Sequence, residues 1–228
     1  MFSSAPAPLS YLWFCAAFQA PQPPCESPLT KAGRHALHFS PLIWSRSASC
    51  EVPDRWPAPL LDDHEKLLHY LAAARQRGVK FDVGHGAGSF HFRNAEPAVR
   101  QGFWPDSIST DLHAGSINGA LIDMLNVMSK FLAMGVPLKE VIRESTTNPA
   151  TQIKRPQLGQ IAAGAEADVA VLRLEKGRFG FVDVKGGRIE GVQRLGCEMT
   201  VRAGKIVFDS NGRAGTPWRE AKIDYPTR

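Results

Sequence analysis

The chain has 228 residues, which suits one or two domains, and 43% of them are hydrophobic, which is enough for a packed core. These values exclude a wholly disordered or fibrous chain. The formal net charge of +5 comes from an excess confined to residues 151–228, which carry 14 basic and 9 acidic side chains. Because this excess contains no run of Lys and Arg, it is typical of a solvated surface, and we expect no nucleic-acid partner.

The cysteines and the amino-terminal segment bear on where the protein works. The four cysteines lie far apart, with neither a CxxC pair nor the Cys/His spacing of a zinc finger. Residues 8–20 are apolar, but no Lys or Arg precedes Lys31, and Phe18 stands where signal cleavage after Ala20 needs a small residue. No run approaches the ~20 apolar residues of a membrane-spanning helix. We therefore expect a soluble, cytoplasmic protein without a membrane partner.

Composition changes near residue 60. Ten of the 17 prolines fall in residues 1–59, where no helical or strand periodicity is visible, so we expect this segment to be irregular and disordered. The patterns that follow predict an α/β unit over residues 60–155 and a small β unit over 156–213. Residues 214–228 are expected to form a tail.

Residues 60–135 alternate between helical and strand patterns. The pattern predicts a helix capped by Asp62 or Asp63 and ended by Gly78, a strand at 79–83, a helix at 94–101, a strand at 106–110 and a helix at 119–134. Such alternation predicts parallel strands joined by right-handed crossovers. Functional side chains should then emerge at the carboxyl ends of the strands.

After Pro137 the chain changes from helical to strand periodicity. A helix is predicted at 138–145, and a turn at 148–150 follows it. Short antiparallel strands follow at 168–174, 179–185, 197–202 and 205–208, with turns at 186–187, 203–204 and 211–212.

Polar residues follow both predicted parallel strands, and we expect them to face one mouth. Asp111 and His113 come after the second strand, where Asp111 is either a metal ligand that moves protons or an ordinary turn or capping residue. His85 lies in the loop Gly84–Gly88 after the first strand, as either a metal or substrate ligand or a histidine bonded within the loop. The glycine spacing suggests a phosphate cradle, although it matches neither GxGxxG nor GxxxxGK[ST].

Four motifs, taken in order, resemble the carboxyl-terminal part of a metal-dependent amidohydrolase. They are FDVGHG at 81–86, STDLH at 109–113, TNPA at 147–150 and GAEADVAVL at 164–172. The most similar branch is the dihydroorotase-like amidohydrolase/deacetylase group, and the resemblance covers about residues 60–213. It implies an α/β fold, namely the carboxyl-terminal portion of a TIM-like (β/α)8 barrel followed by a small β-sandwich. It also implies one or two divalent metals, usually zinc, at the carboxyl ends of the strands.

The resemblance also implies roles for individual residues. Asp111 matches the carboxylate after the eighth barrel strand, which binds metal and acts as general acid and base. His85 matches the histidine in the loop after the seventh strand, so His85 and Gly86 are expected at the substrate mouth, with His113 as a nearby partner. The implied reaction is attack by metal-activated water on an amide or ester bond of a small acylated molecule.

The departures from the family pattern are large. The chain contains no His-x-His pair, which the family places on its first strand. A full barrel needs about 250 residues. We therefore expect residues 1–59 to be unrelated to the family. We also expect the chain to be an incomplete fragment that is inactive alone and completed by a homo-oligomer or a separate amino-terminal barrel half.

Two other functions remain open from the sequence. A non-catalytic interaction module would use the apolar helix Ala120–Met134 and unpaired strand edges. A phosphate-binding protein would use the Gly84–Gly88 loop and would not depend on zinc.

Overall fold

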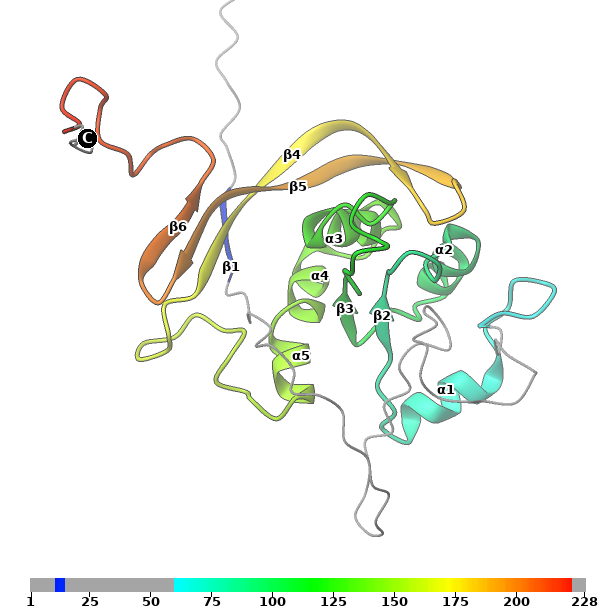
Figure 1. Ribbon diagram of the computed structural model, residues 1–228. Coiled ribbons are helices and arrows are strands. Elements are labelled where there is room, and N and C mark those ends of the chain that lie inside the picture. The colour runs from blue at the N-terminus through cyan, green and yellow to red at the C-terminus, as the bar shows by residue number, and fades with distance from the viewer. Residues whose placement is uncertain (1–10, 15–59, 223–228) are drawn as a thin grey trace, which may run out of the picture.

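The computed structural model describes residues 11–14 and 60–222. They form an α/β arrangement in which helices surround a short parallel strand pair, and a long antiparallel hairpin arches over helix α3 (Figure 1). Most of the predicted disordered segment, and the end of the predicted tail, lie outside the described residues. Within the described part of the chain, no helix is both long and apolar enough to cross a membrane.

The parallel strand pair confirms the predicted alternation. Strand β2 (Asp82–Gly84) pairs with β3 (Ser107–Ser109), and helix α2 (Phe92–Arg100) lies between them in the chain. Val83 and Ile108 are paired across the strands and buried in the hydrophobic core. Because side chains alternate along a strand, Asp82 and Ser107 lie on the other face. Each strand is shorter than the sequence pattern suggested.

Helix α1 (His69–Gln76) begins later than predicted, and its predicted aspartate cap is wrong. The Asp62 carboxylate instead accepts hydrogen bonds from the backbone N–H groups of His64 and Lys66, which closes a turn before the helix. Leu71 is the buried residue of the helix, and the predicted stop at Gly78 is consistent with its left-handed φ of 91°.

Helix α3 (Met124–Ala133) is the central helix of the core. Asp123 caps it by accepting a hydrogen bond from the backbone N–H of Asn126, so the helix starts later than the predicted residue 119. Its apolar residues Val127, Met128 and Phe131 are fully buried. The helix therefore offers no free apolar face, which removes the main surface proposed for an interaction module.

Two short helices follow α3. The prediction of α4 (Leu138–Glu144) is confirmed, whereas the predicted turn at 148–150 is wrong, because these residues lie in α5 (Thr147–Gln152). Pro149 stands in the first turn of α5, where a helix does not need its backbone N–H. The side chain of Asn148 donates to the carbonyl oxygen of Asp106 at 2.9 Å and so attaches α5 to the start of β3.

The carboxyl-terminal strands are longer than predicted. Strands β4 (Val169–Val182) and β5 (Arg188–Arg202) form one long hairpin, with a register shift between Lys176 and Phe179, and β6 (Lys205–Asp209) pairs with β5. The predicted hairpin turns at 186–187 and 203–204 are confirmed. Strands β4, β5 and β6 lie in one antiparallel sheet, and the described residues do not show the second layer of the expected β-sandwich.

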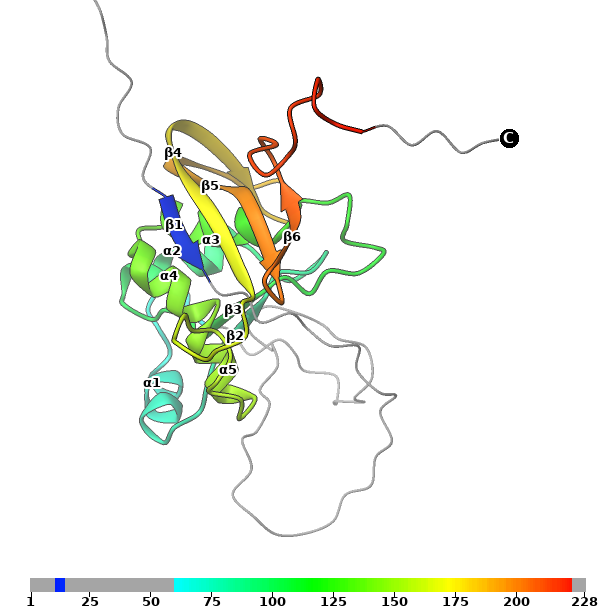
Figure 2. The same ribbon diagram turned by 90° about the vertical axis from the view of Figure 1, so that its left-hand side faces the viewer.

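Strand β1 (Tyr11–Phe14) lies within the segment expected to be irregular. It pairs antiparallel with β4, and Figure 2 shows β1 and β6 at opposite edges of the sheet. Its four residues are aromatic or aliphatic, types that favour strands. The prediction of an irregular segment is therefore wrong at these four residues.

The tip of the β4–β5 hairpin is attached to the α/β part. Asp183 accepts hydrogen bonds from the backbone N–H groups of Phe92, at the start of α2, and of Gly187. The N–H of Val184 also donates to the carbonyl oxygen of Phe90 at 3.2 Å. The long hairpin thus holds the segment that leads from the glycine loop into α2.

Candidate functional site

The carboxyl ends of β2 and β3 bring the glycine loop and Asp111 together. The N–H of Gly86 donates to the carbonyl oxygen of Thr110 at 2.9 Å. A Cβ atom at Gly86 would lie 2.7 Å from Oδ2 of Asp111, and the φ of Gly86 is 51°. A side chain at this position would displace the Asp111 carboxylate and strain the backbone, so both the space and the backbone favour glycine.

Asp111 has an exposed carboxylate on a constrained backbone. Its φ is 51°, in the left-handed region that non-glycine residues seldom adopt. The hydroxyl of Ser116, a fully buried residue, donates to the Asp111 carbonyl oxygen at 3.3 Å. Unusual backbone held by its surroundings is common at functional sites. An exposed carboxylate here can accept a proton or ligate a cation.

His113 shapes the turn after Asp111. Its backbone N–H donates to the Ser116 hydroxyl at 2.9 Å, and its Nδ1 accepts a hydrogen bond from the N–H of Gly115 at 3.1 Å. The residue is exposed. The structure therefore places His113 on the same loop as Asp111, with one ring nitrogen engaged in the turn.

His85 lies inside the core rather than at an open mouth. Its side chain is fully buried and stacks on Phe90, with ring centroids 4.7 Å apart. Nε2 lies 2.7 Å from Nζ of Lys130, and Nδ1 lies 3.0 Å from the carbonyl oxygen of Gly86. Burial and the charge of Lys130 lower the pKa of His85 to about 4. Both ring nitrogens have partners within the protein, and the expected contact of His85 with substrate stays a prediction.

Lys130 is a residue of this region that the sequence analysis missed. It is fully buried, and its Nζ also donates to the carbonyl oxygen of Ala120 at 2.6 Å. Burial lowers the pKa of Lys130 to about 8. In the sequence, Lys130 could have been found as a single charged residue within an apolar helix, where it stands between the buried residues Met128 and Phe131.

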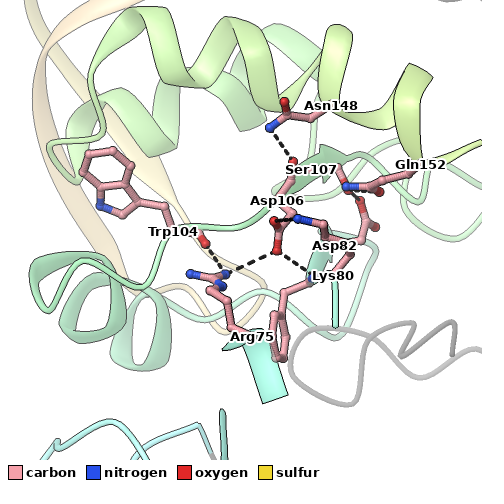
Figure 3. A network of polar contacts seen from close by, with 9 residues as sticks. Arg75, Lys80, Asp82, Trp104, Asp106, Ser107, Asn148 and Gln152 are labelled. Atoms are coloured by element: carbon pink, nitrogen blue, oxygen red, sulfur yellow. Dashed lines mark hydrogen bonds and ion pairs between the residues drawn. The ribbon is translucent and has the colours of Figure 1, made fainter. Parts of the chain in front are cut away.

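The opposite, amino-terminal end of the strand pair holds a paired polar network (Figure 3). The Asp106 carboxylate accepts from the backbone N–H of Phe81 and from Lys80, both at 3.0 Å, and lies 3.5 Å from Nη2 of Arg75. Asp82 accepts from the hydroxyls of Ser107 and Ser109. These carboxylates are engaged with several donors each, which indicates a stabilising role.

Glu144 lies next to this network and is nearly fully buried. Burial, with the nearby charges of Glu140 and Asp106, raises the pKa of Glu144 to about 7. Its Oε2 has no hydrogen-bond partner among the described residues. The structure therefore holds one carboxyl group whose charge is disfavoured in the folded state.

The described residues do not make a complete metal site. No three His, Cys, Asp or Glu side chains among them are grouped so that they could hold a metal ion. Catalytic zinc usually has three protein ligands. Asp111, the metal ligand expected from the sequence, has an exposed carboxylate, and its role in metal binding stays a prediction.

The glycine loop does not fit a phosphate cradle. Such a cradle needs several free backbone N–H groups. The N–H groups of His85 and Gly86 donate instead to carbonyl oxygens of the segment Ser109–Thr110. The phosphate-binding alternative is therefore not favoured.

Comparison with known proteins finds relatives for part of the chain. A deacetylase from Brucella anthropi is 38% identical over 112 residues, which make up 49% of this chain and 28% of the relative. A deacetylase from Agrobacterium fabrum is 35% identical over 133 residues, 58% of this chain and 32% of the relative. A deacetylase from Enterococcus faecalis is 32% identical over 143 residues, 62% of this chain and 39% of the relative. The chain thus spans between 28% and 39% of these relatives.

Solved structures also match part of this chain and less than half of their own length. A crystal structure of an adenine deaminase matches with a TM-score of 0.62 and 30% identity, over 66% of this chain and 41% of the other. A dihydroorotase structure matches with a TM-score of 0.53 and 31% identity, over 61% of this chain and 38% of the other. The amidohydrolase family model matches residues 68–207, which include both parallel strands, Asp111 and most of the antiparallel sheet. On this match, which spans more than half of its length, the chain belongs to the amidohydrolase family.

Proposed function

We propose that this chain forms part of a hydrolase that cleaves an amide or ester bond in a small acylated molecule, with Asp111 as its reactive carboxylate. The observation that carries the proposal is the approach of Asp111 to Gly86 at the carboxyl ends of two parallel strands. The deacetylase relatives and the deaminase and dihydroorotase structures support a reaction at a carbon–nitrogen or ester bond. In this proposal β2 and β3 are the last two strands of a barrel.

Asp111 suits the proton transfers of such a hydrolysis. An exposed carboxylate can accept a proton from the attacking water and return it to the leaving nitrogen or oxygen. The carboxylate lies next to the glycine loop, in the space that a Cβ atom at Gly86 would take up. General acid–base catalysis of this kind contributes about 100-fold or more to a rate.

The divalent metal implied by the family resemblance, zinc in most members, needs ligands beyond Asp111. The described residues do not supply them. We therefore propose that a complete site forms in an assembly, either a homo-oligomer or a complex with a separate chain that carries the remaining barrel strands. An isolated monomer of this chain is then expected to be inactive.

The proposal is tested by a hydrolysis screen. The full chain is purified from zinc-supplemented cells, its assemblies are kept intact, and O-acetyl and N-acetyl substrates are offered. We expect Asp111→Ala to lower any hydrolysis by about 100-fold. The control Asp63→Ala, at an exposed turn residue, should retain the full rate. Equal rates for wild type and Asp111→Ala, or no hydrolysis by any wild-type assembly, would contradict the proposal.

A further inference from the structure

Lys130 connects the two loops that form the candidate site. From α3, its Nζ reaches Nε2 of His85, in the glycine loop after β2, at 2.7 Å. The same atom reaches the carbonyl oxygen of Ala120, in the segment between β3 and α3, at 2.6 Å. That segment also contains Asp111. One buried ammonium group thus joins the loop that carries Gly86 to the loop that carries Asp111.

The hydrogen bonds on both sides of His85 agree on one ring tautomer. The Gly86 carbonyl oxygen only accepts, so Nδ1, at 3.0 Å from it, must carry the proton. An ammonium group only donates, so Nε2 must be the bare, accepting nitrogen toward Lys130. A neutral ring with its proton on Nδ1 satisfies both neighbours at once. The low pKa of the ring is consistent with the neutral form.

The next contact leads from this ring to the reactive carboxylate. Nδ1–H of His85 holds the carbonyl of Gly86, and the N–H of Gly86 is held by Thr110 at 2.9 Å. The Gly86 backbone is therefore fixed on both sides of its α-carbon. The Asp111 carboxylate lies beside that carbon, because a Cβ atom built on it would be 2.7 Å from Oδ2 of Asp111. A change in the His85 tautomer would put a bare nitrogen opposite the Gly86 oxygen and release this peptide.

We propose that Lys130 is a positioning residue, which fixes the Nδ1–H tautomer of His85 and through it the Gly86 backbone against which Asp111 lies. His85 thereby acts through its two ring nitrogens inside the protein, and not on the substrate. A buried charge on an apolar helix is costly unless it is well paired. The positioning role explains why a lysine occupies this place, where an apolar residue would pack more simply. The inference rests on the proposed function only for the role of Asp111.

The first test uses the wild-type chain and NMR of the imidazole nitrogens. We expect His85 to show a protonated Nδ1 and a bare Nε2 near neutral pH. A proton on Nε2 would overturn the proposal. This measurement needs neither metal nor substrate, so its result is independent of whether the chain hydrolyses anything.

The second test compares Lys130→Met with Lys139→Met, a matched change at an exposed lysine of α4. Lys130→Met should give a mixture of His85 tautomers and speed amide hydrogen exchange at Gly86 by about tenfold. Lys139→Met should leave both readouts unchanged. An unchanged tautomer and unchanged Gly86 exchange in Lys130→Met would overturn the proposal. If Lys130→Met does not fold, the proposal is judged by the tautomer of His85 measured in the wild-type chain.

Discussion

The two ends of the β2–β3 strand pair use carboxylates in opposite ways. At the amino end, Asp106 is held by a backbone N–H, a lysine and an arginine, and little of its side chain is exposed (Figure 3). At the carboxyl end, Asp111 is exposed and has a left-handed backbone. Asp106 therefore has several donors that hold it in place, whereas the carboxylate of Asp111 is open to solvent, as the role proposed for it requires.

The largest expected effect on stability comes from a change at Asp106, at the amino-terminal end of the β2–β3 strand pair. Asp106→Ala removes the acceptor of the Phe81 N–H and the carboxylate paired with Arg75, so we expect the free energy of unfolding to fall by about 2–4 kcal/mol. Chemical denaturation measures this loss. Glu65→Ala is the control, because Glu65 and its partner Arg100 are 64% and 61% exposed and such pairs contribute about 0–1 kcal/mol. Equal losses in both variants would contradict the comparison.

The second prediction concerns the buried Glu144. Its pKa is raised from 4.5 to about 7, so its contribution to stability is complete below pH 4.5 and is lost as the pH rises through about 7. We expect Glu144→Gln to stabilise the protein by up to about 3 kcal/mol at pH 8 and by little at pH 4. Unfolding curves at the two pH values measure the difference. The same change in stability at both pH values would show that ionisation of Glu144 is not involved.

The third prediction concerns His85, whose ionisation makes the free energy of unfolding fall at low pH rather than at high pH. The pKa of His85 is lowered from 6.5 to about 4, so its contribution to stability is complete above pH 6.5 and is lost as the pH falls through about 4. We expect wild type to lose about 3 kcal/mol over this window from His85 alone. His85→Phe should flatten the slope, because phenylalanine can stack on Phe90 without titrating. A His85→Phe slope equal to that of wild type would contradict the assignment.

The smallest expected effect is at Asp111. Its φ of 51° favours glycine, so Asp111→Gly should raise the free energy of unfolding by about 0.5–1 kcal/mol while removing any metal bound there. Ala203→Gly is the control, since Ala203 has a φ of 48° in the turn between β5 and β6. It should give a similar gain and keep the metal. A loss of stability in Asp111→Gly would mean that the carboxylate stabilises the loop.

The sequence predicted the parallel pair and the approach of the glycine loop to Asp111, because local periodicity and glycine placement determine both. It did not predict Lys130 as the partner of His85, since their contact joins residues far apart in the chain. The sequence analysis also predicted two strands where the structure has the single strand β4, because Lys176-Gly177-Arg178 has the composition of a turn. In the structure these three residues stay in the strand, with a shift in its register against β5. Strand β1 depends on pairing with β4, which no local pattern in residues 1–59 indicates.

The most direct test of the proposed function is zinc content, measured together with oligomeric state on wild type and Asp111→Ala. The proposal predicts about one zinc or more per chain in a wild-type assembly, lost in Asp111→Ala while the assembly persists. Equal zinc in both proteins, or an assembly that binds none, would contradict the role of Asp111 as the ligand that this chain contributes.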